Sequence, residues 1–189
     1  MRAAVFLDRD DTLIVNRAIT ARTAHPGSLY DPELVRLMPG AATACRALKG
    51  AGYALVVVTN QGAVARGQCT IAQVEQTNTR MCEIVRAETG VDLDAVYYCP
   101  YHPKGTVAPW NTEHPERKPA PGMLLRAMRE LEIDAARSWM IGDAERDIQA
   151  AIAAGIAVER TIVVGGEEVV SVGWRVGGMG KAARVVVGV

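Results

Sequence analysis

The chain has 189 residues, of which 49% are hydrophobic and 22% charged, the balance of a globular protein and not of a disordered one. Its 21 basic and 21 acidic residues cancel, so it lacks the basic excess of a non-specific nucleic-acid binder. The four cysteines are widely spaced, and the N-terminal apolar run is too short for a signal peptide or a membrane span. These features predict one cytoplasmic domain over residues 1–189, with no nucleic-acid or membrane partner.

Short apolar, β-branched runs predict strands that are buried on both faces. They cover residues 3–7, 54–58, 95–98, 138–141, 161–164 and 184–187. Helical patterns lie over residues 39–51, 70–88, 121–131 and 145–154, and the second opens with a Thr70-x-x-Gln73 capping box. This alternation predicts a three-layer α/β domain with a mostly parallel sheet, whose site lies at the carboxyl ends of the strands.

Two stretches break the rhythm of strands and helices. Residues 14–38 and 100–121 are rich in Pro, Gly, His and charged residues and predict long loops. Long loops in a compact domain are usually functional, so we expect both to flank the site. The Gly-rich stretch 165–180 gives no clear pattern.

Seven polar residues fall at predicted strand ends or just before predicted helices. They are Asp8, Asp10, Thr59, Asn60, Lys118, Asp143 and Asp147. Carboxylates that converge repel one another unless a cation lies among them, and all-oxygen ligands suit Mg²⁺. A carboxylate beside such a metal can attack phosphorus, and a second one can protonate the leaving oxygen and later activate water. A hydroxyl, an amide and a lysine can stabilise the phosphoryl group.

Four segments resemble, in order, the four motifs of the haloacid-dehalogenase (HAD) superfamily of aspartate-nucleophile phosphatases. They read FLDRDDTL (6–13), VVTNQ (57–61), RKP (117–119) and IGD (141–143) followed by Asp147. The Asp-Arg-Asp of the first motif resembles the branch of histidinol phosphatases and heptose-bisphosphate phosphatases. The segments TNQGAVARG (59–67) and RKPAPGM (117–123) are more similar to the heptose enzymes.

The resemblance implies a Rossmann-like HAD fold with a minimal cap, a Mg²⁺ cofactor and a monomer. It implies a phosphomonoesterase acting on a small phosphorylated metabolite, best a sugar bisphosphate such as D-glycero-D-manno-heptose 1,7-bisphosphate, which would lose its 7-phosphate. Histidinol phosphate or another small metabolite is the alternative substrate, and a non-catalytic phospho-ligand binder is the alternative function.

The resemblance also assigns roles by position. Asp8 would be the nucleophile and Asp10 the general acid and base, while Thr59 and Lys118 would hold the phosphoryl group. Asp8, the backbone carbonyl of Asp10, and Asp143 would bind Mg²⁺, with Asp147 orienting that site from behind. The implied substrate contacts are Asn16, Arg17, Asn60, Gln61, Gly62 and Arg117.

The sequence departs from this branch at three places. The branch often carries a structural zinc before its third motif, but the set available here is Cys99, His102, His114 and Glu116, mixed and irregularly spaced. Such sets are uncommon zinc sites, so we expect a zinc-free loop held by prolines, Trp110 and hydrogen bonds. Asp11 replaces the usual Gly, and Ala144 replaces a Lys that heptose phosphatases often carry. The chemistry is therefore better specified than the substrate.

Overall fold

A six-stranded sheet is the centre of the computed structural model, which describes residues 1–165 and 172–188. The strands are β1 (Ala4–Leu7), β2 (Ala54–Asn60), β3 (Ala95–Cys99), β4 (Trp139–Gly142), β5 (Thr161–Val164) and β6 (Trp174–Val176). They follow the order β3-β2-β1-β4-β5-β6, and all five neighbouring pairs are parallel. The parallel β2-β1-β4 arrangement brings the carboxyl ends of three strands to the same edge.

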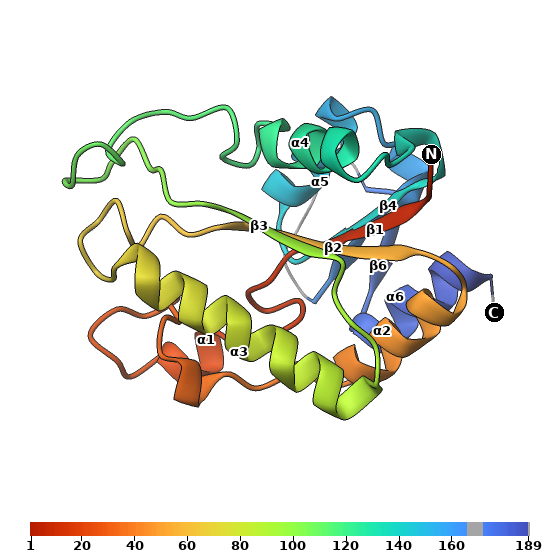
Figure 1. Cartoon of the computed structure of the whole chain (residues 1–189), viewed down its shortest axis with the longest axis horizontal. Helices are drawn as coiled ribbons and strands as arrows, with labels where there is room; N and C mark the ends of the chain where they lie inside the picture. The colour runs from red at the N-terminus through yellow and green to blue at the C-terminus, as the bar shows by residue number, and fades with distance from the viewer. Residues whose placement is uncertain (166–171, 189) are drawn as a thin grey trace.

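Helices cover both faces of the sheet. Within the described ranges they are α1 (Arg17–Thr20), α2 (Ala41–Gly50), α3 (Ile71–Thr89), α4 (Gly122–Glu130), α5 (Glu145–Ala153) and α6 (Met179–Val187), with 3₁₀ turns at Pro32–Leu34, Ala135–Arg137 and Val158–Arg160. Helices α2, α3 and α6 lie on one face, and α4 and α5 lie on the other (Figure 1). None of the described helices is long and apolar enough to cross a membrane.

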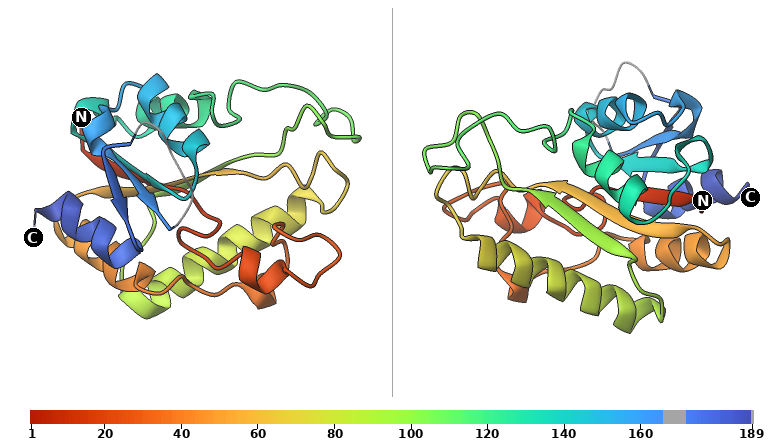
Figure 2. Two further views of the ribbon diagram at one scale, coloured as in Figure 1. Left: turned by 180° about the vertical axis from the view of Figure 1, so that it is seen from behind. Right: turned by 45° about the horizontal axis from the view of Figure 1, so that its top comes forward.

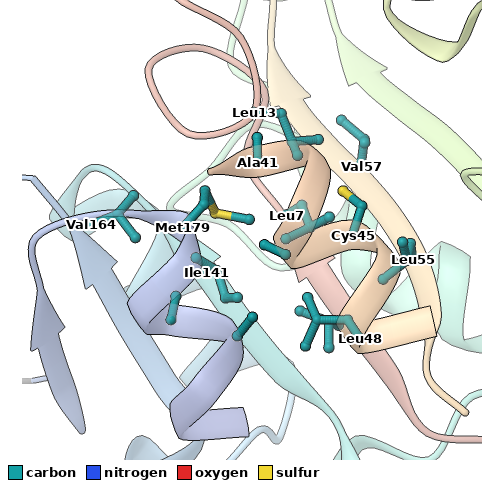
Figure 3. Packing of buried hydrophobic residues seen from close by; sticks show 14 of the residues in the cluster. Leu7, Leu13, Ala41, Cys45, Leu48, Leu55, Val57, Ile141, Val164 and Met179 are labelled. Atoms are coloured by element: carbon teal, nitrogen blue, oxygen red, sulfur yellow. The ribbon is translucent and has the colours of Figure 1, made fainter. Parts of the chain in front are cut away.

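Two apolar cores result, one on each side of the sheet. Figure 3 shows the larger core, where α2 and α6 lie side by side on the sheet. Leu7 and Ile141 from the strands meet Leu48 of α2 and Met179 of α6 there, all of them essentially inaccessible to solvent. Every residue of β1 is buried, which explains why its sequence is continuously apolar and does not alternate.

Most predicted elements are confirmed. The first five predicted strands correspond to β1–β5, and the four predicted helices correspond to α2, α3, α4 and α5. The capping box at the start of α3 is present, with Gln73 N–H donating to the Thr70 hydroxyl and Thr70 N–H donating to the Gln73 side chain. The segment 100–121 contains no helix or strand, and segment 14–38 contains only α1 and one 3₁₀ turn.

One predicted strand is wrong. Residues 184–187 belong to α6, whose buried residues Met179, Ala182, Ala183 and Val186 recur at helical spacing and face α2. Packing of that face outweighs the strand preference of three consecutive valines. The last strand is instead β6, a short and largely exposed segment that the sequence pattern missed.

Candidate active site

Predicted site residues from separate parts of the chain converge at the carboxyl edge of the sheet. Asp8 directly follows β1, Thr59 lies near the end of β2, and Asp143 directly follows β4. The segment 100–121 brings in Lys118, and all four side chains are almost fully buried. The loops around residues 14–38, 61–70 and 100–121 extend from this same end of the molecule (Figure 2).

Lys118 is the buried cation at the centre of the site. Its Nζ lies 2.6 Å from Asp8 Oδ1 and 2.6 Å from Asp147 Oδ1, and it donates to the Val58 carbonyl at 2.6 Å. Burial alone would lower the pKa of Lys118, but the carboxylates of Asp147 and Asp8 outweigh burial and raise it. Lys118 is therefore a fixed positive charge against one oxygen of Asp8.

Asp147 is placed by the start of α5. Its Oδ2 accepts the Ala144 N–H, in the geometry of a capping box, while its Oδ1 faces Lys118. A Cβ on Gly142 would lie 2.5 Å from the Cβ of Asp147, so this close approach requires glycine at position 142. Asp147 thus contacts Lys118 directly, a contact that its predicted role behind the metal did not include.

The arrangement of carboxylates fits a hard cation. Asp8, Asp143 and Asp147 each offer an oxygen within 4.8 Å of the others. Asp8 Oδ2 and Asp143 Oδ1 are buried and accept no hydrogen bond among the described residues, although Arg146 Nη2 lies 3.7 Å from Asp143 Oδ1. The other oxygen of each carboxylate faces Lys118 or Arg17. Burial, and then the nearby carboxylates of Asp8 and Asp147, raise the pKa of Asp143 to about 7. A divalent cation would relieve this repulsion and supply the missing partners.

Asp10 does not belong to this carboxylate group. Both of its oxygens accept from the Arg9 guanidinium, and Gln61 Nε2 donates to Asp10 Oδ2 and to the Thr59 hydroxyl, each at 2.9 Å. Burial raises the pKa of Asp10, and the charge of Arg9 opposes that rise. A carboxyl group whose pKa is raised keeps its proton to a higher pH than an ordinary aspartate, which suits general acid and base chemistry. Sequence analysis missed Arg9 as part of this arrangement.

Two residues that were predicted to contact the substrate, Asn60 and Asn16, hydrogen-bond through their side-chain amides to other parts of the protein. Asn60 donates to the Lys118 carbonyl at 2.8 Å and accepts from the Lys118 N–H at 3.0 Å, so its side chain holds the backbone of the lysine. Asn16 donates to the Gly27 carbonyl within the 14–38 segment. Both contacts favour a positioning role for these amides over direct substrate binding.

Arg17 and Asp11 connect the 14–38 segment to the carboxylate group. The Asp11 carboxylate accepts the backbone N–H groups of Asn16 and Arg17 and faces the Arg17 guanidinium, at 3.4 Å. Arg17 Nη2 in turn donates to Asp143 Oδ2 at 2.8 Å. The unusual aspartate at position 11 therefore places α1 and directs its arginine at a predicted metal ligand.

A group of basic side chains adjoins Gln61 and Lys118. Burial lowers the pKa of Arg117, and the positive charges of Arg146 and Arg66 lower it further, so each of these two arginines acts electrostatically on Arg117. Arg66 also lies against Gly62, where a Cβ would be 3.2 Å from its Nη1. Arg117 donates to the Tyr101 carbonyl at 3.0 Å. This edge of the site can receive an anionic group besides the one at Asp8.

The four potential zinc ligands are not gathered into one group of ligating atoms in the described part of the chain. In the part of the chain that the structure describes, the three aspartates are the only His, Cys, Asp or Glu group close enough to hold an ion. The His114 ring instead stacks on Tyr101, with centroids 4.0 Å apart, and Tyr101 meets Trp110 edge-on at 5.0 Å. Cys99 is buried, and the Nδ1 atoms of the two loop histidines accept backbone N–H groups within the loop.

Comparisons with known proteins agree with this geometry. Residues 27–155 match the model of the haloacid dehalogenase-like hydrolase family. The chain is 43% identical, over 86% of its own length and 81% of the relative's, to the D-glycero-β-D-manno-heptose-1,7-bisphosphate 7-phosphatase of Yersinia pestis. The corresponding enzyme of Pasteurella multocida is 38% identical over 87% and 82% of the two chains.

A solved structure shows the same fold at the level of the whole chain. The D,D-heptose 1,7-bisphosphate phosphatase of B. bronchiseptica, solved with magnesium and phosphate, superposes with a TM-score of 0.75 at 26% identity and covers 96% of each chain. The family match, the extensive identity and the shared architecture agree. This chain therefore belongs to the haloacid dehalogenase-like hydrolases and has their Rossmann-like α/β fold.

Proposed function

We propose that this hydrolase is a Mg²⁺-dependent phosphomonoesterase that removes the 7-phosphate of D-glycero-D-manno-heptose 1,7-bisphosphate through an aspartyl-phosphate on Asp8. The observation that carries the proposal is the state of the Asp8 carboxylate, which is buried with Oδ1 against Lys118 and with no hydrogen bond to Oδ2. The proposed substrate comes from the relatives, which are heptose-1,7-bisphosphate 7-phosphatases and match this chain over most of its length.

The proposed reaction has two steps, transfer of the phosphoryl group from the sugar to Asp8 and then from Asp8 to water. A carboxylate oxygen of Asp8 attacks phosphorus, the bond from phosphorus to the sugar oxygen breaks, and Asp10 gives its proton to that oxygen. Asp10 then takes a proton from a water molecule that attacks the aspartyl-phosphate, which releases inorganic phosphate and restores Asp8. Lys118 stabilises the negative charge throughout, and the Thr59 hydroxyl can donate to a phosphoryl oxygen.

Asp8 and Asp143, with the Asp10 carbonyl, are the groups that would hold Mg²⁺. Their oxygen chemistry matches that ion, as do the two buried carboxylate oxygens that accept no hydrogen bond. When bound, Mg²⁺ neutralises the charge of the incoming phosphoryl group. Arg17 holds Asp143 from the outer side, which would orient this ligand in the manner of an outer-sphere partner.

The basic group of Arg66, Arg117 and Arg146 supports a bisphosphate over a monophosphate. A guanidinium binds a phosphate in a bidentate geometry, and a second phosphate would offset both the burial of Arg117 and the positive charges of Arg146 and Arg66 that lower its pKa. Arg117 is next to Lys118 in sequence, so one loop would contact both ends of a small bisphosphate. The missing lysine at position 144 would leave this arginine group as the main anion-binding element.

The test is phosphate release with Mg²⁺, with and without EDTA, on both anomers of heptose 1,7-bisphosphate, heptose 7-phosphate, histidinol phosphate and fructose 1,6-bisphosphate. We expect the highest kcat/KM on one heptose bisphosphate anomer. Arg117→Gln should reduce the preference for the bisphosphate over the 7-monophosphate about tenfold. The exposed Arg129→Gln, on the surface of α4, is the matched control. A higher kcat/KM on histidinol phosphate would contradict the proposed substrate. Turnover that persists in EDTA would contradict the proposed dependence on Mg²⁺.

A further inference from the structure

Arg9 is a fully buried arginine between the two aspartates of the first motif. Its Nη1 donates to Asn78 Oδ1 of α3 at 2.9 Å, and its Nη2 donates to the Leu29 carbonyl at 3.1 Å. Its Nε and Nη2 both lie 3.1–3.3 Å from the two oxygens of Asp10. One guanidinium thus joins a catalytic carboxylate, the 14–38 segment and a long helix.

These contacts fix the orientation of the Asp10 carboxyl group. The planar fork of the guanidinium meets both carboxylate oxygens from one side, and Gln61 Nε2 meets Oδ2 as well. Arg9 itself cannot rotate freely, because Asn78 and Leu29 accept from its remaining nitrogen positions. Asn78 is buried too, with 6% of its surface exposed, so the anchor of the fork is inside the protein.

Burying an arginine costs free energy of desolvation unless each of its N–H donors finds an acceptor. The presence of a fully buried arginine at position 9 therefore calls for an explanation. An apolar residue at position 9 would pack between strand and helix without that cost. The guanidinium is instead directed at a carboxylate that must point at the leaving oxygen to transfer a proton. Lysine would keep the charge but not the fork, because its ammonium is a single point of contact.

We infer that Arg9 is a positioning residue that holds the Asp10 carboxyl group in line for proton transfer and connects its orientation to the 14–38 segment and to α3. The inference rests on the proposed function, because it assigns Arg9 a part in the acid step of that reaction. It goes beyond that function because it adds Arg9, Asn78 and the Leu29 carbonyl to the parts that determine the rate.

The test compares two leaving groups. An alkoxide leaving group needs a proton from Asp10, whereas p-nitrophenolate leaves without one. The kcat/KM value reports steps only up to departure of the leaving group, so it separates the acid step from later hydrolysis of the aspartyl-phosphate. We expect Arg9→Gln to lower kcat/KM about 100-fold for heptose 1,7-bisphosphate and less than about threefold for p-nitrophenyl phosphate. Asp10→Asn gives the reference pattern, and Arg9→Lys should lie between wild type and Arg9→Gln.

Two further variants keep the test decisive if Arg9→Gln does not fold. Asn78→Ala leaves Asp10 and Arg9 in place but removes the anchor, and it should shift the same ratio about threefold to tenfold. Arg80→Gln changes an exposed arginine two residues along α3 and should leave the ratio unchanged. Equal losses on both substrates in every folded variant would overturn the inference, because they would show a structural role alone. If wild-type protein released no phosphate, or if Asp8→Asn remained active, the proposed function would fail instead.

Discussion

Acidic side chains at the two edges of the sheet differ in how completely they are hydrogen-bonded. At the amino edge, Asp94 precedes β3 and accepts hydrogen bonds at both oxygens, from Arg2 at one and from Lys49 and the Leu55 N–H at the other. At the carboxyl edge, Asp8 and Asp143 each keep one buried oxygen with no hydrogen-bond partner in the described ranges. Complete hydrogen bonding indicates a scaffold, whereas unpartnered buried oxygens indicate a site prepared for a ligand.

Two neutral side chains, Ser138 and Thr59, show the same contrast. Ser138 at the amino edge accepts from the Ala4 N–H and donates to the Asp134 carbonyl, so its hydroxyl joins β1 to the turn before β4. Thr59 at the carboxyl edge accepts from Gln61, and its hydroxyl hydrogen can still be donated to a ligand. Substitutions at the two edges should therefore separate activity from stability.

The largest effect should follow Asp8→Asn. The amide is a poor nucleophile, so turnover should fall at least ~10³-fold on every substrate. The measurement is phosphate release at saturating substrate, and acid-stable capture of ³²P on the protein should disappear with it. The amide is isosteric, so a folded variant is expected. Activity within tenfold of wild type would show that Asp8 is not the nucleophile.

Asp143→Asn should lower activity by about 100-fold because it weakens a predicted metal ligand. Its effect on stability should have the opposite sign. Asp143 is buried beside Asp8 and Asp147, and removing its charge relieves the repulsion among three carboxylates. In EDTA the variant should therefore melt at a higher temperature than wild type, a trade-off expected of a functional site. A lower melting temperature in EDTA would show that its contact with Arg17 outweighs the repulsion.

Trp110→Ala should have a moderate effect, confined to substrate binding. Trp110 meets Tyr101 in the stack with His114, and Arg117 donates to the Tyr101 carbonyl. Loss of the indole should loosen this support and raise KM several-fold with kcat nearly unchanged.

Purified wild-type protein should contain no stoichiometric zinc by elemental analysis. About one zinc per chain would instead show that a metal holds the loop.

The position of the site could be predicted from the sequence because it depends on strand ends. Asp8 and Asp143 follow buried apolar runs directly, and parallel strands bring such residues to one edge whatever the loops do. The start of α3 was predictable for a similar reason, because a capping box is a local signal. The prediction of a C-terminal strand is wrong because the burial of Met179, Ala182 and Val186 on one helix face outweighs the β-branched composition of residues 184–187.

The contacts between distant segments could not be predicted. The sequence indicates that Lys118 belongs to the site, but not that Asn60 binds its backbone on both sides or that Asp147 pairs with it. The sequence identifies Arg9 only as the middle residue of the Asp-Arg-Asp motif and assigns it no contact, because its partners Leu29 and Asn78 lie 20 and 69 positions away. Such contacts depend on the paths of the loops, and composition or periodicity does not encode those paths.

The smallest effect on activity should follow Asp94→Asn at the amino edge, where stability alone should change. Burial would raise the pKa of Asp94, but the hydrogen bonds from Lys49 and the Leu55 N–H outweigh it and lower the pKa below its ordinary value of 3.8. A carboxylate whose pKa is lowered by folding stabilises the protein above its unfolded pKa, and this contribution is lost as the pH falls through the folded value. The variant should therefore be about 1 kcal/mol less stable than wild type at pH 7. The difference should close as the pH is lowered below about 4, as measured by urea unfolding across that range.

The kcat/KM of Asp94→Asn should equal that of wild type. A loss of activity comparable to that of Asp143→Asn would mean that the two edges are coupled, and the division between scaffold and site would not hold.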